Sequence, residues 1–313
     1  MLDPKLLHKF SIVAARAAYS SSLLKGKNDK IAADQAAVDS MRNYLNKIEM
    51  NGKIVIGEGE MDEAPMLYIG EKLGTGDGEP LDIAVDPLDG TTLTAKNLPN
   101  AISVIAVSEK GNLLQAPDTY MEKIAIGPGF PENIVDLDNT VEKNLKNIAE
   151  FKSVKISDLT VCLLERDRHI KIINSLNKLS VNIKFISDGD VLGAIYTCIN
   201  NFKVDMYVGT GGAPEGVLAA AAIKGFGGQF QGRLVISNND EKLRATKLGI
   251  SDMQRKYYLN DLVKGDVIFC AAGVTDGEIL KGIRVEDSNF LSDLLVLHSD
   301  QKIIKIYTET FEI

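Results

Sequence analysis

Residues 82–91 read Asp-Ile-Ala-Val-Asp-Pro-Leu-Asp-Gly-Thr, an apolar run that ends in two carboxylates and a turn. The apolar run predicts a short buried strand, and the proline and glycine after it fix the turn. Asp86 and Asp89 stand three residues apart and can face one cation, for which oxygen ligands favour Mg²⁺ or Mn²⁺. Backbone N–H groups around Gly90 and Thr91 can hold a phosphate. The alternative is a surface turn with solvated carboxylates, but the position after an apolar strand favours the cation site.

The pattern of a short apolar strand followed by polar or glycine-rich residues recurs along the chain and alternates with helical periodicity. Strands are predicted over 53–57, 82–86, 102–107, 161–164, 184–186 and 204–208, with one more after a turn at 110–112. Helices are predicted over 4–24, 31–50, 170–179, 190–200 and 214–224, with a short one opening at Pro65. Strands and helices that alternate through short loops indicate the α/β class.

The domain organisation is predicted from length and charge. A chain of 313 residues corresponds to two domains of ~150 residues. The charged helix over 138–152 is the predicted boundary, which gives an N-terminal metal-binding domain, 1–150, and a C-terminal substrate domain, 151–313.

Composition excludes several classes of protein. Hydrophobic residues make up 45% and charged residues 25%, which is typical of a globular protein and excludes a disordered chain or a fibre. The net charge is 35 − 43 = −8, which argues against a nucleic-acid partner because phosphate backbones need a basic face. It does not argue against a small anionic substrate, because a bound metal can invert the local field.

Cysteine usage and hydropathy suggest a cytoplasmic protein. Cys162, Cys198 and Cys270 are widely spaced among apolar residues, as expected of free thiols in a reducing compartment, and they form no zinc-binding cluster. No uncharged stretch is longer than twelve residues, so we expect no membrane-spanning helix and no membrane partner. The N-terminus lacks the apolar region of a signal peptide.

A second acidic cluster follows the predicted strand at 53–57. It contains four carboxylates within six residues, Glu58, Glu60, Asp62 and Glu63. Such charges repel one another unless cations or water relieve them. A solvated loop is the alternative, and the place directly after a strand favours a metal site.

Residues 209–216 read Gly-Thr-Gly-Gly-Ala-Pro-Glu-Gly and open an alanine-rich helix. A Rossmann fingerprint fails here because Pro214 occupies the last glycine position. We interpret the stretch as a glycine loop that lets a ligand approach the backbone, with Glu215 in the first helical turn. The alternative for Glu215 is an acidic residue favoured by the helix dipole. Asp34 lies among alanines, where a carboxylate needs a partner unless it points to solvent.

Two further motifs suit a phosphorylated sugar. Arg166-Asp-Arg-His169 follows a strand, and arginine side chains bind phosphate in a bidentate manner; the alternative is a surface salt-bridge cluster. Asp188-Gly-Asp190 can bind sugar hydroxyls, or it can cap a helix. The three histidines are scattered, so no Ser–His–Asp or Cys–His nucleophile is indicated, and no Walker A motif is present.

Together, residues 55–67, 86–91, 116–123 and 211–216 resemble the bacterial class II fructose-1,6-bisphosphatases, and the similarity runs from about Lys5 to Gly282. The 86–91 string alone is similar to the broader inositol-monophosphatase-like superfamily. The resemblance implies a layered αβαβα fold and two divalent ions, Mn²⁺ or Mg²⁺. It also implies hydrolysis of the 1-phosphate of D-fructose 1,6-bisphosphate to fructose 6-phosphate in gluconeogenesis. The region 236–261 diverges, and the tail after Gly282 matches poorly.

The resemblance also implies site residues. One metal would be bound by Asp34 and Glu58, and the other by Asp86, Asp89 and Glu215. Some family members have glutamate where Asp89 stands. Thr91, which is placed to orient the attacking water, and Asp62 are the implied catalytic residues. The implied substrate contacts are Asp89, Gly90, Thr91, Tyr120, Arg166, Asp167, Arg168, Asp188, Gly189, Asp190 and Gly212.

Two alternatives remain beside the bisphosphatase. A sedoheptulose-1,7-bisphosphatase or an inositol-phosphate phosphatase would differ only in the outer pocket. A non-catalytic phosphosugar-binding regulator is disfavoured because the predicted metal ligands and Thr91 are intact. The expected partner is a small-molecule sugar bisphosphate, and we expect a homo-oligomer, a dimer or a tetramer.

Overall fold

The computed structural model describes residues 2–57 and 67–313. The chain divides into two compact units, one of Met1–Leu114 with Val263–Ile313 and the other of Gln115–Leu262. The predicted boundary at residue 150 coincides with neither border. Helix α4 (Val141–Lys152), which was expected to separate the domains, lies inside the second unit because its apolar face packs into that unit's core through Leu145 and Ile148.

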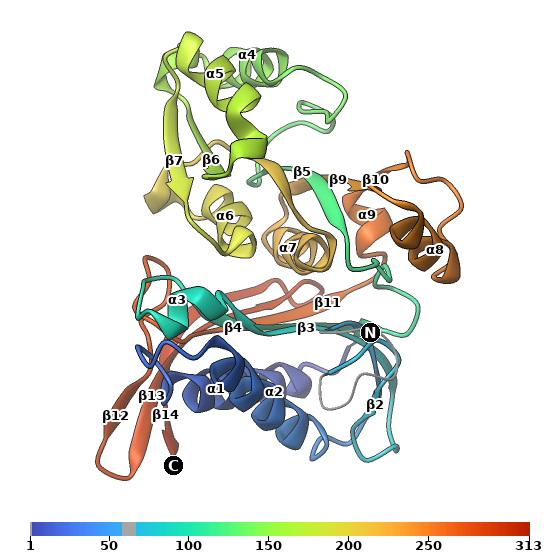
Figure 1. Ribbon diagram of the computed structural model, residues 1–313, viewed down its shortest axis with the longest axis vertical. Coiled ribbons are helices and arrows are strands. Elements are labelled where there is room, and N and C mark those ends of the chain that lie inside the picture. The colour runs from blue at the N-terminus through green and yellow to red at the C-terminus, as the bar shows by residue number, and fades with distance from the viewer. Residues whose placement is uncertain (1, 58–66) are drawn as a thin grey trace. The chain divides into compact units, whose positions relative to one another are not determined.

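The first unit is an eight-stranded sheet with two helices packed on one face (Figure 1). Helices α1 (Lys5–Ser22) and α2 (Lys30–Leu45) form this layer, and the short α3 (Thr91–Ala95) packs against α2. The strand order is β12-β13-β11-β4-β3-β1-β2, with β14 beside β13. Among the described residues of this unit, only β1 and β3 pair in parallel. The strands are β1 (Asn51–Ile56), β2 (Lys72–Leu73), β3 (Pro80–Asp89), β4 (Ile102–Glu109), β11 (Val267–Gly273), β12 (Arg284–Glu286), β13 (Asn289–His298) and β14 (Ile303–Glu312).

Helix α2 is shorter than its apolar pattern predicted. Asp29 caps its start by accepting a hydrogen bond from the N–H of Ala32 at 2.9 Å. The helix ends at Leu45 rather than near Met50. Ile48 and Met50 follow the helix but are buried in the same core. Their apolar side chains therefore continue the helical pattern in the sequence although the chain there is no longer helical.

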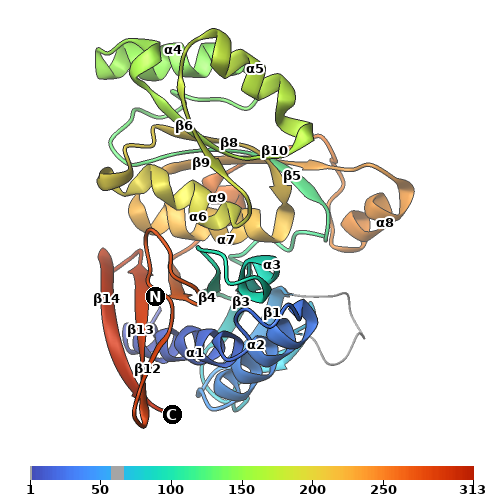
Figure 2. The same ribbon diagram turned by 60° about the vertical axis from the view of Figure 1, so that its left-hand side comes forward.

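The second unit is a six-stranded sheet between two helical layers (Figure 2). Helices α4 and α5 (Ile170–Lys178) cover one face, and α6 (Asp190–Ile195) and α7 (Ala213–Phe226) cover the other. The order is β10-β9-β5-β8-β6-β7, in which β6 pairs in parallel with β7 and β8. The strands are β5 (Tyr120–Ile126), β6 (Thr160–Leu164), β7 (Asn182–Ile186), β8 (Met206–Gly212), β9 (Gln229–Val235) and β10 (Lys256–Tyr258), and the remaining helices are α8 (Asn239–Lys247) and α9 (Leu259–Leu262).

The α/β class is confirmed. The first unit contributes one helical layer and a sheet, and the second contributes a sheet between two helical layers. These are the layers that the predicted αβαβα fold requires. The strand predicted after the turn at 110–112 is wrong, because that segment forms only one bridge, between Leu113 and Val263, where the chain passes from one unit to the other.

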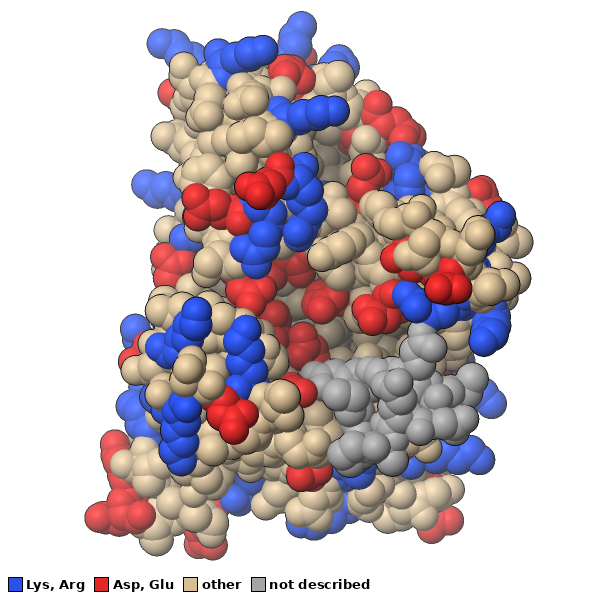
Figure 3. Space-filling view, viewed as in Figure 1, with Lys and Arg blue, Asp and Glu red and all other residues tan. Residues whose placement is uncertain are grey.

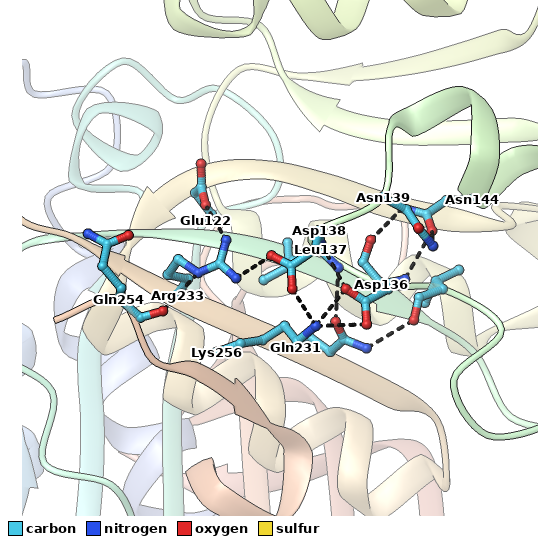
Figure 4. A network of polar contacts seen from close by, with 11 residues as sticks. Glu122, Asp136, Leu137, Asp138, Asn139, Asn144, Gln231, Arg233, Gln254 and Lys256 are labelled. Atoms are coloured by element: carbon cyan, nitrogen blue, oxygen red, sulfur yellow. Dashed lines mark hydrogen bonds and ion pairs between the residues drawn. The ribbon is translucent and has the colours of Figure 1, made fainter. Parts of the chain in front are cut away.

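A polar network fixes the segment between β5 and α4 against the sheet (Figure 4). The Nζ atom of Lys256 on β10 donates to Asp136 at 2.6 Å and to Asp138 at 2.7 Å, and Arg233 on β9 also binds Asp138. These two carboxylates raise the pKa of Lys256, although its burial opposes them. The backbone N–H of Leu137 donates to Gln231 at 3.0 Å. The network replaces strand pairing along this stretch of chain.

Charged side chains of both signs cover the surface. On the described part of the face in Figure 3, Lys and Arg gather in several groups, and Asp and Glu gather in others, with uncharged side chains between them. Within residues 2–57 and 67–313, none of the helices has the length and apolar character needed to cross a membrane.

Candidate functional site

The predicted site residues divide between the two units. The first unit contains Asp34, Asp86, Asp89, Gly90 and Thr91. The second contains Tyr120, Arg166, Asp167, Arg168, Asp188, Gly189, Asp190, Gly212 and Glu215. Glu58, Asp62 and the helix predicted from Pro65 lie outside the described residues.

A bulge in β3 places Asp86 and Asp89 on the same face of the sheet. Asp86 pairs with Val104 and Asp89 pairs with Ile102, so three steps along β3 match two along β4. Side chains alternate between faces in a regular strand, and residues three apart would point in opposite directions without the extra residue. Leu88 between them packs into the core beneath α1 and α2. The prediction that both carboxylates can face one cation is therefore compatible with the backbone.

The turn after β3 needs its glycine. Gly90 has φ = 99°, and a Cβ atom there would lie 2.8 Å from Cδ1 of Leu93. The conformation starts α3 at once, with Thr91 at its first position, partly buried. Before this turn, within the bulge of β3, Oδ1 of Asp86 accepts a hydrogen bond from the N–H of Leu88 at 3.1 Å.

The loop before α2 holds this turn and Asp34 in one neighbourhood. Gly26 N–H donates to Thr94 O at 3.0 Å, and Asn28 N–H donates to Ala95 O at 2.8 Å, so the loop between α1 and α2 is bonded to α3. Asp34 lies one turn into α2 and is partly buried rather than fully solvated. Among the residues described, no three His, Cys, Asp or Glu side chains gather closely enough to hold a metal.

The predicted glycine loop at 209–212 is wrong, since these residues form the end of strand β8. The glycines make room for side chains from neighbouring elements. A Cβ at Gly209 would lie 3.0 Å from Cε1 of His169, and one at Gly211 would lie 1.9 Å from Oδ2 of Asp190. The predicted helix start after them is confirmed, with α7 beginning at Ala213.

His169 is a neutral anchor of the arginine segment. Its ring is 1% exposed, its Nε2 accepts from the N–H of Thr210 at 2.8 Å, and its Nδ1 lies 2.8 Å from Leu164 O. Because a backbone N–H only donates and a carbonyl only accepts, the hydrogen must be on Nδ1 and the ring must be neutral. Burial accordingly lowers the pKa of His169, with Arg168 adding to the effect.

Arg168 and Arg166 have different surroundings. The Nε of Arg168 donates to Thr210 O at 2.8 Å, and its guanidinium lies 4.8 Å from the centre of the Tyr120 ring. Among the residues described, Arg168 forms no ion pair. Arg166 lies 3.7 Å from Asp188, so it is the member of the motif that fits a surface salt bridge. The structure thus brings Tyr120 and Arg168 together.

Asp190 belongs to a buried cluster that sequence reasoning missed. Lys123 on β5 is 1% exposed, and its Nζ donates to Oδ2 of Asp190, 5% exposed, at 2.6 Å. The hydroxyl of Tyr207 donates to the same oxygen at 3.2 Å. Within the motif at 188–190, Gly189 is the N-cap of α6, without a side-chain cap hydrogen bond, and Asp190 is the first residue of the helix. Lys123 lies on the same strand face as the apolar residues Met121 and Ala125. A single charge on an apolar strand face can be recognised only once residues 120–126 are known to form a strand.

Glu215 offers a carboxylate oxygen that fits a cation. Its Oε2 is buried, with no hydrogen-bond partner among the described residues. Gly212 allows this position, because a Cβ there would lie 1.9 Å from that oxygen. Burial raises the pKa of Glu215, Lys123 opposes the shift and Asp190 adds to it. A buried carboxylate oxygen without a donor is satisfied by a bound hard cation.

A cavity of about 610 Å³ lies in the second unit, at the end of the sheet where strands β6, β7 and β8 begin. It is lined at Thr160, Asn182 and Val204, which begin or precede β6, β7 and β8, and none of the predicted site residues that the structure describes lines it. Ligands in open α/β sheets bind outside the carboxyl ends of the strands. Arg166, Asp188 and Gly212 follow or end β6, β7 and β8, so we place the candidate site at that opposite end rather than in the cavity.

Similarity to known proteins covers nearly the whole chain. The family model described as bacterial fructose-1,6-bisphosphatase, glpX-encoded, matches residues 4–311. The class 2 fructose-1,6-bisphosphatase of Haemophilus influenzae is 42% identical over 318 residues, covering 97% of this chain and 95% of that protein. Fructose-1,6-bisphosphatase 1 class 2 of Escherichia coli is 42% identical over 315 residues, covering 96% of this chain and 93% of that protein.

Among solved structures, the extragenic suppressor protein suhB of Bartonella henselae has a TM-score of 0.35 at 14% identity, with 63% of this chain and 74% of that chain covered. An inositol monophosphatase of Thermotoga maritima has a TM-score of 0.34 at 15% identity, with 64% and 79% covered.

Proposed function

Because the chain belongs to the bacterial fructose-1,6-bisphosphatase family, we propose that it hydrolyses the 1-phosphate of D-fructose 1,6-bisphosphate in gluconeogenesis. The products are fructose 6-phosphate and inorganic phosphate. The observation that carries the proposal is the 42% identity to proteins named class 2 fructose-1,6-bisphosphatase over 97% of this chain.

The family consists of metal-dependent phosphatases, and we propose two divalent ions, Mn²⁺ or Mg²⁺, for this member. Asp34 and Glu58 would bind one ion, and Asp86, Asp89 and Glu215 the other. Two observations support the second set, namely the bulge that turns Asp86 and Asp89 to one face and the buried Oε2 of Glu215. When bound, the ions supply a lowered pKa for an attacking water and charge stabilisation for the leaving oxygen.

Thr91 and Asp62 are the proposed catalytic residues. The hydroxyl of Thr91 stands at the first position of α3, one residue after the left-handed Gly90. From there it would hold the attacking water by a hydrogen bond and fix its direction of approach. The N–H groups of Gly90 and Thr91 would bind oxygens of the same phosphate, with Asp89 also in contact with the substrate. Asp62, in the acidic cluster at 58–63, is assigned by resemblance.

The second unit would bind the sugar and its other phosphate. Arg168 is held in place by Tyr120 and Thr210, so its guanidinium loses little freedom when a phosphate binds. Arg166 and Asp167 would complete this grip. Asp188, Gly189 and Asp190 would contact sugar hydroxyls, with Gly212 as a further contact at the end of β8.

The test is phosphate release from purified protein given fructose 1,6-bisphosphate with Mn²⁺, with Mg²⁺ or with EDTA. We expect turnover with at least one metal and none after exhaustive chelation. Full turnover in EDTA would contradict the two-metal mechanism. Sedoheptulose 1,7-bisphosphate and inositol 1-phosphate assayed in parallel would reassign the substrate if either is cleaved with the higher kcat/KM.

Assembly and location are further parts of the proposal. We propose a cytoplasmic homo-oligomer, either a dimer or a tetramer. Light scattering coupled to size-exclusion chromatography measures the mass directly, and a mass near the 34.0 kDa of one chain would contradict the oligomer.

A further inference from the structure

Lys123 is a lysine in the interior of the second unit. It lies on β5, between β9 and β8 in the middle of the six-stranded sheet. Its neighbours along the strand, Glu122 and Ile124, point to the opposite face, where Ile124 packs into the core beneath α4 and α5. Lys123 therefore points toward α6 and α7, and a Cβ at Gly216 of α7 would lie 3.2 Å from its Cε.

Burial of a lysine at 1% exposure requires a specific partner, and Asp190 provides it. The Nζ of Lys123 and the hydroxyl of Tyr207 both donate to Oδ2 of Asp190. Neither of these bonds occupies Oδ1. The carboxylate is thus held in one orientation with a second oxygen left as an acceptor.

Two sequence features are explained by this arrangement. Gly211 is required because a Cβ there would lie 1.9 Å from Oδ2 of Asp190 and 3.2 Å from Nζ of Lys123. Gly189, at φ = 76°, turns the chain so that Asp190 enters α6 at its first residue. Gly189 and Gly211 lie in motifs that the resemblance assigns to substrate binding. In the structure, they provide the backbone turn and the space that the Lys123–Asp190 ion pair needs.

We propose that Lys123 is a positioning residue for the sugar end of the substrate. By binding Oδ2 of Asp190, it holds Oδ1 ready to accept a hydrogen bond from a sugar hydroxyl. Lys123 itself does not touch the substrate. This inference rests on the proposed function, since it assigns Asp190 to the sugar.

The test compares Lys123→Met with Asp190→Asn, the double variant and Lys123→Arg. Loss of a fixed hydrogen bond to substrate predicts a KM that rises about tenfold in Lys123→Met, with kcat changed less than about threefold. Because Asp190 mediates the effect, the double variant should have the KM of Asp190→Asn alone, so the two changes should not multiply. Lys123→Arg, which keeps the charge, should recover part of the loss.

A matched control separates positioning from stability. Lys152 pairs with Asp205, another buried aspartate of the same unit, at the opposite end of β6 from the candidate site. Lys152→Met should lower the melting temperature and leave KM unchanged. Should Lys123→Met fail to fold, Tyr207→Phe serves instead, because it removes one donor to Oδ2 and keeps the ion pair; its KM should rise about twofold to fivefold.

Unchanged KM in folded Lys123→Met, or in Tyr207→Phe when that variant replaces it, overturns the proposal. The proposal is also overturned if the increase in KM of the double variant equals the product of the increases in Lys123→Met and Asp190→Asn. Failure of the proposed function is detected separately, by measuring which phosphorylated sugars the wild-type protein cleaves. If the wild type cleaves a different phosphorylated sugar, the same comparison is made with that sugar. If it cleaves none, calorimetric Kd values for fructose 6-phosphate replace KM, and a wild type that does not bind this sugar overturns the proposal.

Discussion

The carboxylates of the two units are placed by different means. In the first unit, Asp86 and Asp89 are set by residues within the same short stretch, through a bulge and a left-handed glycine. In the second unit, Asp190 is set by Lys123, 67 residues earlier, and by Tyr207, 17 residues later. Local placement leaves all the residues involved in one short stretch of sequence, whereas the partners that place Asp190 lie far from its motif in the sequence. The difference also predicts that mutations in the two regions fail in different ways.

The largest effect is expected in the locally built turn, at Thr91. Thr91→Ala should lower kcat by about 10²–10⁴-fold with little change in melting temperature, because the hydroxyl is proposed to direct the attacking water. Thr91→Ser keeps the hydroxyl and should stay partly active. Steady-state kinetics and thermal melts on both variants check this. An alanine variant with wild-type kcat would remove Thr91 from the mechanism.

The second prediction tests Glu215, whose carboxylate starts α7. Glu215→Gln should abolish most activity, while the free energy of unfolding without metal changes by only about 0.3–1 kcal/mol, the size of a helix-dipole effect. Mn²⁺ should raise the melting temperature of the wild type more than that of the variant. If the variant melts early yet keeps its kcat, Glu215 is structural.

The third prediction compares glycines of the two regions by stability alone. Gly211→Ala must displace the Lys123–Asp190 pair, and breaking a buried pair costs about 3–5 kcal/mol. Gly90→Ala meets no charged group, only the side chain of Leu93, and it adds the penalty of a left-handed backbone, about 1–2 kcal/mol. Gly111→Ala, with the same backbone sign and nothing within 4 Å, is the control. Denaturant unfolding ranks the three, and equal losses would contradict the comparison.

A smaller effect is expected at Arg168, the prearranged cation of the second unit. Arg168→Ala should raise KM for the bisphosphate by about tenfold and change KM for a monophosphate substrate less, because the inner phosphate is held in the first unit. Arg255→Ala, which removes an exposed ion pair with Asp261, is the control. Equal effects on both substrates would speak against a role at the second phosphate.

The smallest effect concerns pH. Burial lowers the pKa of His169 in the folded protein below the unfolded value of about 6.5. The neutral ring therefore contributes stability that is present above about pH 6.5 and lost as pH falls through the folded pKa. His169→Gln does not titrate, and its side-chain oxygen can accept from Thr210. Urea unfolding between pH 7.5 and 5.5 should show a steeper loss in the wild type, by at most about 1.4 kcal/mol per pH unit. Parallel curves would rule out the neutral anchor.

Features that depend on neighbouring residues were predictable from the sequence. The α/β class, a strand over 82–86, the turn at Gly90 and the helix that begins beside Pro214 follow from short patterns, because periodicity, proline and glycine act within a few residues. The predicted end of that strand at Asp86 is wrong, because β3 continues through Pro87 to Asp89. Strand β5 was missed because Lys123 interrupts its apolar face, and only its partner Asp190 makes that lysine tolerable in the interior.

Only the tertiary structure decided how distant segments share a unit. The return of Val263–Ile313 to the first sheet, the role of Gly209–Gly212 as a strand and the neutral state of His169 each depend on contacts between segments far apart in the chain. Sequence determined which side chains stand at strand ends, because that is set by local patterns. The tertiary structure decided which of these side chains are in contact. A buried charge is stable only beside a suitable partner, and a glycine is required only where a neighbouring side chain occupies the space of its missing Cβ atom.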